Sequence, residues 1–395
     1  MMKHQTGILC AVSMILLLNP FAIGFEATPV DPIENLQKTP DVDKGVIVWA
    51  ERIEGDWDVY GLDLFNPAGG LIYIAAYTGS NQDRPEIWND RVVFQEDVDG
   101  DWDIYVSDIS DANLPVDYLL TRTADYFLND QIAPVVHGNT AVWQSYVVVD
   151  DGHGGTLEDW DIYAADITEP NNAFVYVVDE FPFDQQQPAV YRSKVVYRDN
   201  TEGNWDLWEA DVWLKDSPQY RTAISDEAGP RLNQTAPVVW GDIIVYEHET
   251  AGGDVDIYGR DMSQPDSMPF LISGGSGVQQ APDISGHIVV WQDDRNGNWD
   301  IYGYNLTTRQ EFQITTNLAH QTNPAISGTL AVWEDSRVTP ANIYHTWLED
   351  DVAADCPNRL AGDVDGDCRV NLVDFVRMAE EWLTCALNPI SACVN

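Results

Sequence analysis

Lysine and arginine are scarce in this chain. The 395 residues include 20 of them against 65 aspartates and glutamates, which gives a formal net charge of -45. Such a charge repels a polyanion, so the sequence excludes nucleic acid as a partner. It suits an exported protein that meets calcium outside the cell, where carboxylates are natural ligands of that ion.

Long apolar stretches are also absent, apart from one near the N-terminus. That run extends from Gly7 to Leu18, which is shorter than the roughly 20 residues of a membrane-spanning helix. It follows Lys3 and leads to small residues near Ala22. Residues 1–24 are therefore predicted to be a secretory signal peptide. No membrane span is expected after cleavage, and the protein should be secreted or lie on the cell surface, with the periplasm as the alternative.

Catalytic signatures are missing as well. The seven histidines show no metal-ligand spacing, and the chain contains no GxSxG, HExxH or phosphate-binding glycine loop. Acidic pairs are so frequent that a general acid and base cannot be chosen from the sequence. We therefore assign no catalytic and no cofactor-binding residue, and a non-catalytic protein is favoured.

A repeat dominates what is present, from residue 25 to residue 350. Its marker is Trp299-Asp300-Ile301-Tyr302, with Val289-Val290-Trp291-Gln292 before it and a proline further upstream. The marker aspartate recurs at intervals of 42 to 58 residues, and its seven equivalents are Asp58, Asp103, Asp161, Asp206, Asp256, Asp300 and Asn342. The upstream prolines are Pro40, Pro85, Pro134, Pro188, Pro237, Pro282 and Pro324. Three landmarks in one register indicate a unit that stacks on its neighbours.

Each copy is composed of short strands. Its segments are rich in β-branched and aromatic residues and are separated by turn sequences such as Arg295-Asn296-Gly297-Asn298. Four strands in about 45 residues predict one blade of a β-propeller, because radial closure hides most sheet edges. Seven copies predict an all-β, seven-bladed propeller, or six blades if the weakest copy is only an edge. The last copy stops after three strands near Leu348, so we expect residues 26 to 36 to complete its blade.

The pattern Pro-x-Ile-x-Gly, Val-Val-Trp-Gln-Asp-x-Arg-x-Gly-Asn-Trp-Asp-Ile-Tyr and then Ile-Thr resembles the repeats of the TolB-like propeller group. The resemblance covers most of the mature chain. It implies a propeller that acts as a binding platform or accessory domain more often than as an enzyme.

The recurrent Trp-Asp pair is predicted to be structural because nearly every blade carries it. We expect the aspartate to bind backbone donors beside the turn and the aromatic ring to fill the wedge between blades. The hairpins between second and third strands should lie on the face of the blade-to-blade connections, and their acids, such as Asp293 and Asp294, should surround it. We hypothesise that this face attracts a cation or a carbohydrate. An insertion at Tyr146 to Glu158 is the first place to look for a ligand.

The last residues, 351–395, form a different module. Its acids fall at positions one, three, five and twelve of a calcium loop, with an asparagine at position nine and a backbone carbonyl at position seven. The expected metal ligands are Asp363, Asp365, Asp367, Arg369, Asn371 and Asp374. Apolar residues with helical spacing follow the loop. The segment resembles one half of a dockerin type I module, although Cys368 replaces the usual glycine and a second loop is missing.

Four cysteines also fall in this module, namely Cys356, Cys368, Cys385 and Cys393. In a short segment of an exported chain they predict two disulfides, with three connectivities that the sequence does not separate. The dockerin resemblance implies calcium as a cofactor and a cohesin-like protein or surface component as a partner.

These features predict a secreted, non-catalytic propeller that acts as a binding or scaffold protein and displays one loop-rich face. A calcium-stabilised tail is predicted to attach it to a protein partner or to the cell surface. A carbohydrate ligand on the loop face fits this prediction. The alternative is a carbohydrate-active enzyme, either a polysaccharide lyase or a glycoside hydrolase, since dockerin-type tails usually accompany polysaccharide-degrading catalysts.

Overall fold

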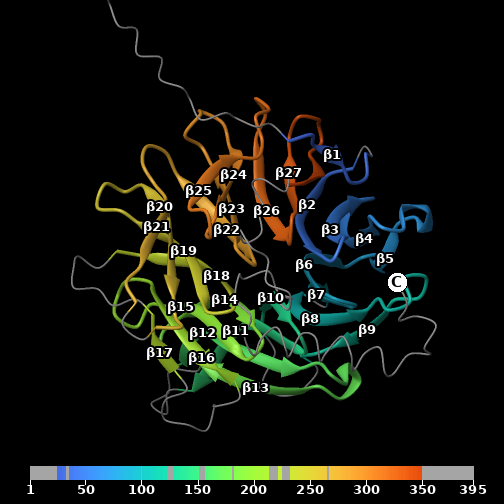
Figure 1. Cartoon of the computed structure of the whole chain (residues 1–395). Coiled ribbons are helices and arrows are strands. Elements are labelled where there is room, and N and C mark those ends of the chain that lie inside the picture. The colour runs from blue at the N-terminus through green and yellow to red at the C-terminus, as the bar shows by residue number, and fades with distance from the viewer. Residues whose placement is uncertain are drawn as a thin grey trace, which may run out of the picture.

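The computed structural model describes residues 25–348 except 33–34, 99, 122–128, 151–155, 180–181, 213–220, 225–231 and 265–266. In this described part the strands form seven four-stranded antiparallel sheets arranged around one axis (Figure 1). The predicted seven-bladed propeller is confirmed, and the alternative of six blades is wrong. The predicted signal peptide, the calcium loop and all four cysteines of the tail lie outside the described residues.

The blades follow one another along the chain, each built outward from the axis. The first three contain β2 (Gln37–Asp43), β3 (Val46–Ile53), β4 (Asp56–Asp63) and β5 (Ile72–Ala75), then β6 (Asn81–Trp88), β7 (Arg91–Val98), β8 (Asp101–Asp108) and β9 (Val116–Leu119), then β10 (Gln131–His137), β11 (Thr140–Asp150), β12 (Thr156–Asp166) and β13 (Phe174–Asp179). The next three contain β14 (Gln185–Tyr191), β15 (Lys194–Asp199), β16 (Asp206–Asp211) and β17 (Arg221–Ala223), then β18 (Gln234–Trp240), β19 (Ile243–Glu249), β20 (Val255–Asp261) and β21 (Phe270–Ser273), then β22 (Gln279–Ser285), β23 (Ile288–Asp293), β24 (Asp300–Asn305) and β25 (Gln310–Gln313).

The seventh blade closes the ring with a strand from the other end of the chain. It contains β26 (Gln321–Ser327), β27 (Leu330–Asp335) and β28 (Asn342–Trp347), and its outer strand is β1 (Thr28–Pro29). Thr28 pairs with His345, and Val30 donates a backbone hydrogen bond of 2.9 Å to the carbonyl oxygen of Ile343. The predicted completion of this blade by residues 26 to 36 is confirmed.

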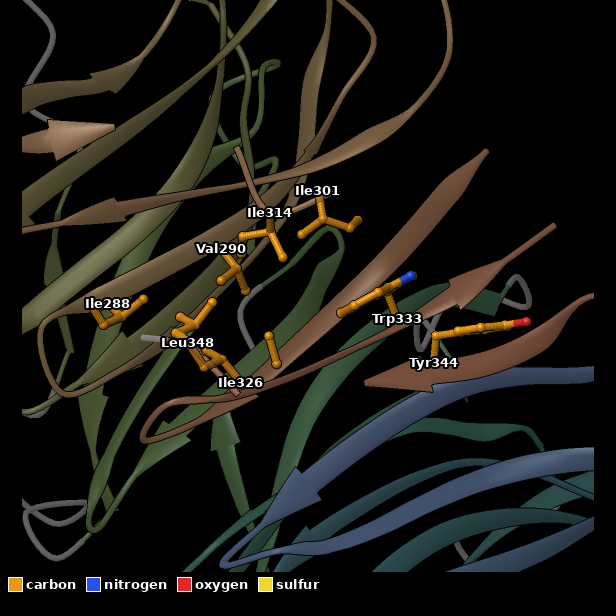
Figure 2. Close-up of a cluster of buried hydrophobic side chains, with 9 residues drawn as sticks. Ile288, Val290, Ile301, Ile314, Ile326, Trp333, Tyr344 and Leu348 are labelled. Atoms are coloured by element: carbon orange, nitrogen blue, oxygen red, sulfur yellow. The ribbon is translucent and has the colours of Figure 1, made fainter. Parts of the chain in front are cut away.

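The core is divided into wedges between neighbouring blades. Successive side chains of a strand point to opposite faces, so Val289 and Trp291 pack toward the fifth blade while Val290 packs toward the seventh. Figure 2 shows one wedge, in which Val290 and Ile301 face Trp333 of the next blade. The second-strand rings Trp49, Trp143, Trp291 and Trp333 are fully buried. The Val-Val-Trp run therefore connects each blade to both of its neighbours.

Each repeat proline lies at a bulge in an inner strand. The residue before it has a positive φ, between 46° and 54° in all seven copies. This residue and the proline are left out of the pairing between the first and second strands of the blade. Proline is suited to this place because a bulged residue needs no ladder hydrogen bond. In six copies the preceding N–H instead donates to a side chain of the previous blade, as Asn323 does to Gln292 (2.9 Å) and Ala281 to Glu247 (2.9 Å), whereas Arg84 donates to Asp83 of its own strand (2.8 Å).

The marker aspartates make structural contacts: Asp256 accepts a hydrogen bond from the backbone of Gly275, as predicted, but Asp300 has other partners. Asp300 accepts hydrogen bonds from the side chains of Asn296 (2.9 Å), Asn298 (3.1 Å) and Gln313 (3.1 Å) rather than from backbone donors. The backbone N–H of the neighbouring Trp299 donates to His320 of the next blade (3.2 Å). The marker thus ties one hairpin together and fixes it to the following blade.

Candidate functional site: the central channel

The seven inner strands lie around the axis of the propeller (Figure 1). Their side chains line a central channel. Equivalent positions of β2, β6, β10, β14, β18, β22 and β26 line a cavity of about 410 Å³. Each strand contributes the stretch from the residue before its proline to the third residue after it, except β14, whose lining residues end at Val190. The volume lies within the range of about 300 to 1,000 Å³ that is typical of small-molecule pockets.

The channel is open at the end where the inner strands begin. The residues before the prolines form this mouth, and each is partly or fully exposed: Thr39, Arg84, Ala133, Gln187, Ala236, Ala281 and Asn323. This end lies on the side of the connections between blades, which is also the side of the hairpins between second and third strands. The channel therefore opens on the face that the sequence predicts to be acidic.

Aromatic side chains fill the opposite end of the channel. The third residue after the proline is Trp88, His137, Tyr191 and Trp240 in the second to fifth blades. Ring centroids are 3.7 Å apart for Trp88 and His137, 4.4 Å for His137 and Tyr191, and 5.4 Å for Tyr191 and Trp240. Trp88 also comes within 6.4 Å of Trp240, so the rings meet across the axis. We call these four residues the aromatic floor.

The other blades place smaller polar residues at the level of the floor. Ser327 donates a hydrogen bond to a carboxylate oxygen of Asp43 (3.2 Å), and the second oxygen of Asp43 accepts from the backbone N–H of Asn89 (2.8 Å). Ser285 accepts from the backbone N–H of Gly328 (2.9 Å). The polar groups here serve to join adjacent inner strands.

Three carboxyl groups stand between the mouth and the floor, one residue after the proline. They belong to Asp41, Glu86 and Asp283. At the same position the other blades have Val135, Ala189, Val238 and Ala325. The acids come from the first, second and sixth blades, so they occupy one side of the channel.

Two of these acids are tied to the next blade. Asp41 accepts a hydrogen bond from the backbone N–H of Ile87, and Asp283 accepts one from that of Ile326, both at 2.7 Å. Burial raises the pKa of Asp41 to about 7 and the pKa of Asp283 to about 6, although these backbone donors oppose the rise. Both carboxyls are therefore costly to ionise where they stand.

Glu86 is the acid that holds a proton most firmly. Burial raises the pKa of Glu86 well above its usual value, and the nearby Asp41 and Asp283 raise it further. Glu86 also forms a side-chain hydrogen bond with Asp41. Because two adjacent carboxyls cannot both ionise cheaply, the Asp41–Glu86 pair holds a proton more firmly than either carboxyl would alone.

Positive charge near the channel is confined to its rim. Arg84 is the one lysine or arginine among the described residues that line the cavity. Lys38 lies beside the mouth, where its ammonium group contacts Asp83 at 2.8 Å and the ring of Trp57 at 3.9 Å. The interior of the channel is thus acidic on one side and apolar or aromatic on the other.

The predicted acidic face is only partly available to a ligand. Asp293 is fully buried, where it accepts hydrogen bonds from the Trp291 indole (3.1 Å) and from Arg295 (2.5 Å). The prediction that it borders the open face is therefore wrong, because the aspartate neutralises an arginine and satisfies the core tryptophan. Two other hairpin acids, Glu202 and Asp254, are exposed.

The predicted insertion is a longer hairpin rather than an enlarged loop. Strands β11 and β12 continue in register as far as Asp150 and Thr156. Tyr146 donates a hydrogen bond to Glu158 (2.8 Å) and its ring lies 5.3 Å from that of Trp160. This insertion extends a blade.

The residues assigned to metal from the sequence, 363–374, lie outside the described residues. Within the described ranges no group of three or more His, Cys, Asp or Glu side chains is arranged to hold a metal ion. A search of the same ranges found no helix long and apolar enough to cross a membrane.

Sequence reasoning missed the channel acids, although a signal was present. The acid follows the repeat proline directly in Pro40-Asp41, Pro85-Glu86 and Pro282-Asp283, where other copies have valine or alanine. The glutamine three residues before each proline was missed too. All seven copies carry it, and it is buried in every blade: Gln37, Gln82, Gln131, Gln185, Gln234, Gln279 and Gln321.

No protein-family model matches the chain, and no curated protein sequence matches it. Its fold is similar to that of solved propellers. An oligogalacturonate lyase from Vibrio parahaemolyticus aligns with a TM-score of 0.60 at 12% identity, over 83% of this chain and 95% of that one. An oligogalacturonate lyase in complex with manganese aligns with a TM-score of 0.57 at 12% identity, over 83% of this chain and 99% of that one.

A puromycin hydrolase aligns with a TM-score of 0.57 at 11% identity, over 79% of this chain. The alignment covers 52% of that enzyme, so this chain spans about half of its length. At such identities the likeness shows the fold alone. The propeller architecture implied by the TolB-like resemblance is in agreement with these structures.

Proposed function

We propose that this protein is an exported, non-catalytic binding protein whose propeller takes a small ligand into the central channel. The observation that carries the proposal is the shape and lining of the cavity, which is open at one end, filled by aromatic rings at the other, and lined by carboxyls between. A propeller that only displayed its surface loops would not need Asp41, Glu86 and Asp283, since four other blades pack equally well with valine or alanine in that place.

Calorimetric titration tests this function. The mature protein is titrated with neutral oligosaccharides, oligogalacturonates and small organic cations, and its behaviour is compared with that of Ala236→Trp. Ala236 lies at the mouth, where Arg84 and Gln187 occupy equivalent positions, so the backbone there accommodates a large side chain. Saturable heat that Ala236→Trp abolishes supports binding in the channel. Saturable heat that is unchanged in Ala236→Trp places the site elsewhere and refutes the proposal.

We propose that the tail attaches the protein to a cohesin-like partner or a surface component and that calcium stabilises it. The support is the order of oxygen ligands at Asp363, Asp365, Asp367 and Asp374, with Asn371 between them and the carbonyl of Arg369. Calcium titration of the full chain tests this. One site that disappears in the Asp365→Asn, Asp367→Asn double variant is the expected result, and unchanged calcium binding contradicts it.

A second candidate function is a carbohydrate-active enzyme. The observation that favours it is the Asp41–Glu86 pair, in which one carboxyl is protonated beside one that can ionise, since an acid and a base are what a lyase or glycoside hydrolase requires. The two oligogalacturonate lyases with this fold point to the same class of substrate. An acidic chain would, however, meet three carboxyls here, so a neutral polysaccharide fits better.

Turnover separates the two functions. Heat that continues in proportion to added polysaccharide, and that is lost in Glu86→Gln, supports the enzyme. Heat that saturates supports the binding protein. Product analysis by release of reducing ends or of unsaturated sugars provides an independent check.

A further inference from the structure

We propose that the channel ligand is a small organic cation, an amine or a quaternary ammonium compound, held between the channel acids and the aromatic floor. This inference rests on the proposed binding function, whose site it shares. It follows from the charge, the aromatic surface and the distribution of polar groups in the cavity.

The charge of the cavity favours a cation. Asp41, Glu86 and Asp283 lie on one wall, and Arg84 lies at the rim rather than in the interior. The rest of the chain adds to the same field, with a formal net charge of -45. A cation is therefore drawn toward the mouth and meets its counter-charge inside.

The floor provides the second element of cation recognition. Trp88 and Trp240 line the end of the channel with His137, Tyr191 packs against these rings from the core, and the ring faces of tryptophan attract ammonium groups. Such contacts are stronger where water is excluded, and Trp88 and Trp240 are both more than half buried. Aromatic rings on one side and carboxyls on the other suit a cation that carries apolar groups.

Other ligand classes fit the lining less well. A sugar needs hydrogen-bond partners along its length, but the wall opposite the acids is formed by Val135, Ala189 and Val238 together with prolines. A bare metal ion needs several ligands around one point, and the described residues contain no such group. An anion would face the carboxyls. A cation with methyl or methylene groups uses both the acidic wall and the apolar wall.

Thermal-shift and calorimetric titrations with choline, tetramethylammonium and 3,3-dimethylbutan-1-ol test the inference. The last compound has the shape of choline with an uncharged carbon in place of nitrogen. We expect saturable binding of both cations and at least tenfold weaker binding of the alcohol. Asp283→Asn keeps the side-chain shape, removes the channel acid that ionises most readily, and should weaken cation binding about tenfold or more. Asp90→Asn, at an exposed turn, should leave it unchanged.

A variant of the aromatic floor completes the design. Trp240→Leu should weaken both cations, and its circular dichroism and melting curve show whether it remains folded. If Trp240→Leu does not fold, the comparison of choline with its uncharged analogue in the wild-type protein still decides the question. Equal affinity for choline and the alcohol, or no binding of either cation, overturns the inference.

The panel also separates this inference from the proposed function. If Ala236→Trp blocks the binding of a neutral oligosaccharide while the cations give no response, the channel binds a ligand but the cation inference is wrong. If no compound of the panel gives heat that depends on Ala236, both are wrong. If the cations bind and Ala236→Trp prevents it, both stand.

Discussion

Replacing Asp41 by asparagine should remove a penalty on folding that grows with pH. Burial is the main reason why the Asp41 carboxyl resists ionisation, and the charges of Asp283 from the sixth blade and of Asp43 on its own strand oppose it further. Its pKa rises from 3.8 to about 7 on folding. A group whose pKa is raised in the folded state binds its proton more tightly there than in the unfolded chain.

The size and pH range of the effect follow from linkage. Below pH 4 both states are protonated and no penalty exists. Between pH 4 and 7 the unfolded chain releases the proton first, so stability falls by up to about 1.4 kcal/mol per pH unit. At pH 8 the total penalty reaches at most about 4 kcal/mol. Asparagine cannot ionise, yet its side-chain oxygen can still accept the hydrogen bond from Ile87.

Urea unfolding followed by tryptophan fluorescence at pH 4, 5, 6, 7 and 8 measures this difference. We expect Asp41→Asn to differ little from wild type, or to be slightly less stable, at pH 4, and to gain relative stability up to pH 8. Asp90→Asn, at an exposed turn, should show a constant difference from wild type across the same range. A difference for Asp41→Asn that does not change with pH, or that changes in the opposite direction, would refute the reasoning.

Three further predictions address the fold and the tail. Trp291→Ala empties a fully buried site and should lower the free energy of unfolding by about 3–5 kcal/mol. Trp347→Ala, at a side chain 44% exposed, should lower it far less. Urea unfolding of both variants checks this. Deleting residues 25–31 removes β1 and takes Val30 and Phe25 out of the last wedges, so melting should shift downward and limited proteolysis should first cut the seventh blade. A reductant combined with a calcium chelator should make residues 352–395 sensitive to protease while the propeller stays resistant, and a tail that stays resistant after both treatments contradicts the calcium and disulfide predictions.

The sequence predicts the architecture well because its landmarks mark positions that every blade needs. The tryptophan at Trp291 is required to fill a wedge, and the aspartate at Asp300 is required to close a hairpin, so both recur with the period of the blade. Even the missing strand of the last blade is predictable, because a three-stranded copy at one end requires a partner from the other end. The residues that repeat with the period of the blade are therefore those that the packing of every blade requires.

The site is harder to predict because it depends on departures from the period. Asp41 follows a proline that all copies share, and only a comparison of aligned copies reveals that acids replace small apolar residues there. The aromatic floor is hidden in the same way, since Trp88 and Trp240 occupy a position that is serine in the sixth and seventh blades. The rings of Trp88 and Trp240 come together across the axis only because the seven blades close into a ring. No local sequence pattern predicts this contact. The environment of Asp293 was mistaken because the sequence does not show that Arg295 folds back onto it.

The asymmetry of the channel is the strongest reason to treat it as a site. A propeller of seven similar blades requires only that the inner strands form equivalent contacts, and Val135 or Ala189 meets that requirement with no charge. The sixth, seventh and first blades nevertheless place Ser285, Ser327 and Asp43 at the floor, while the second to fifth place aromatic rings there. The acids Asp283, Asp41 and Glu86 gather on the polar side. Packing alone does not explain why three carboxyls that are costly to bury stand together beside an aromatic surface, whereas a cation bound between them would offset that cost.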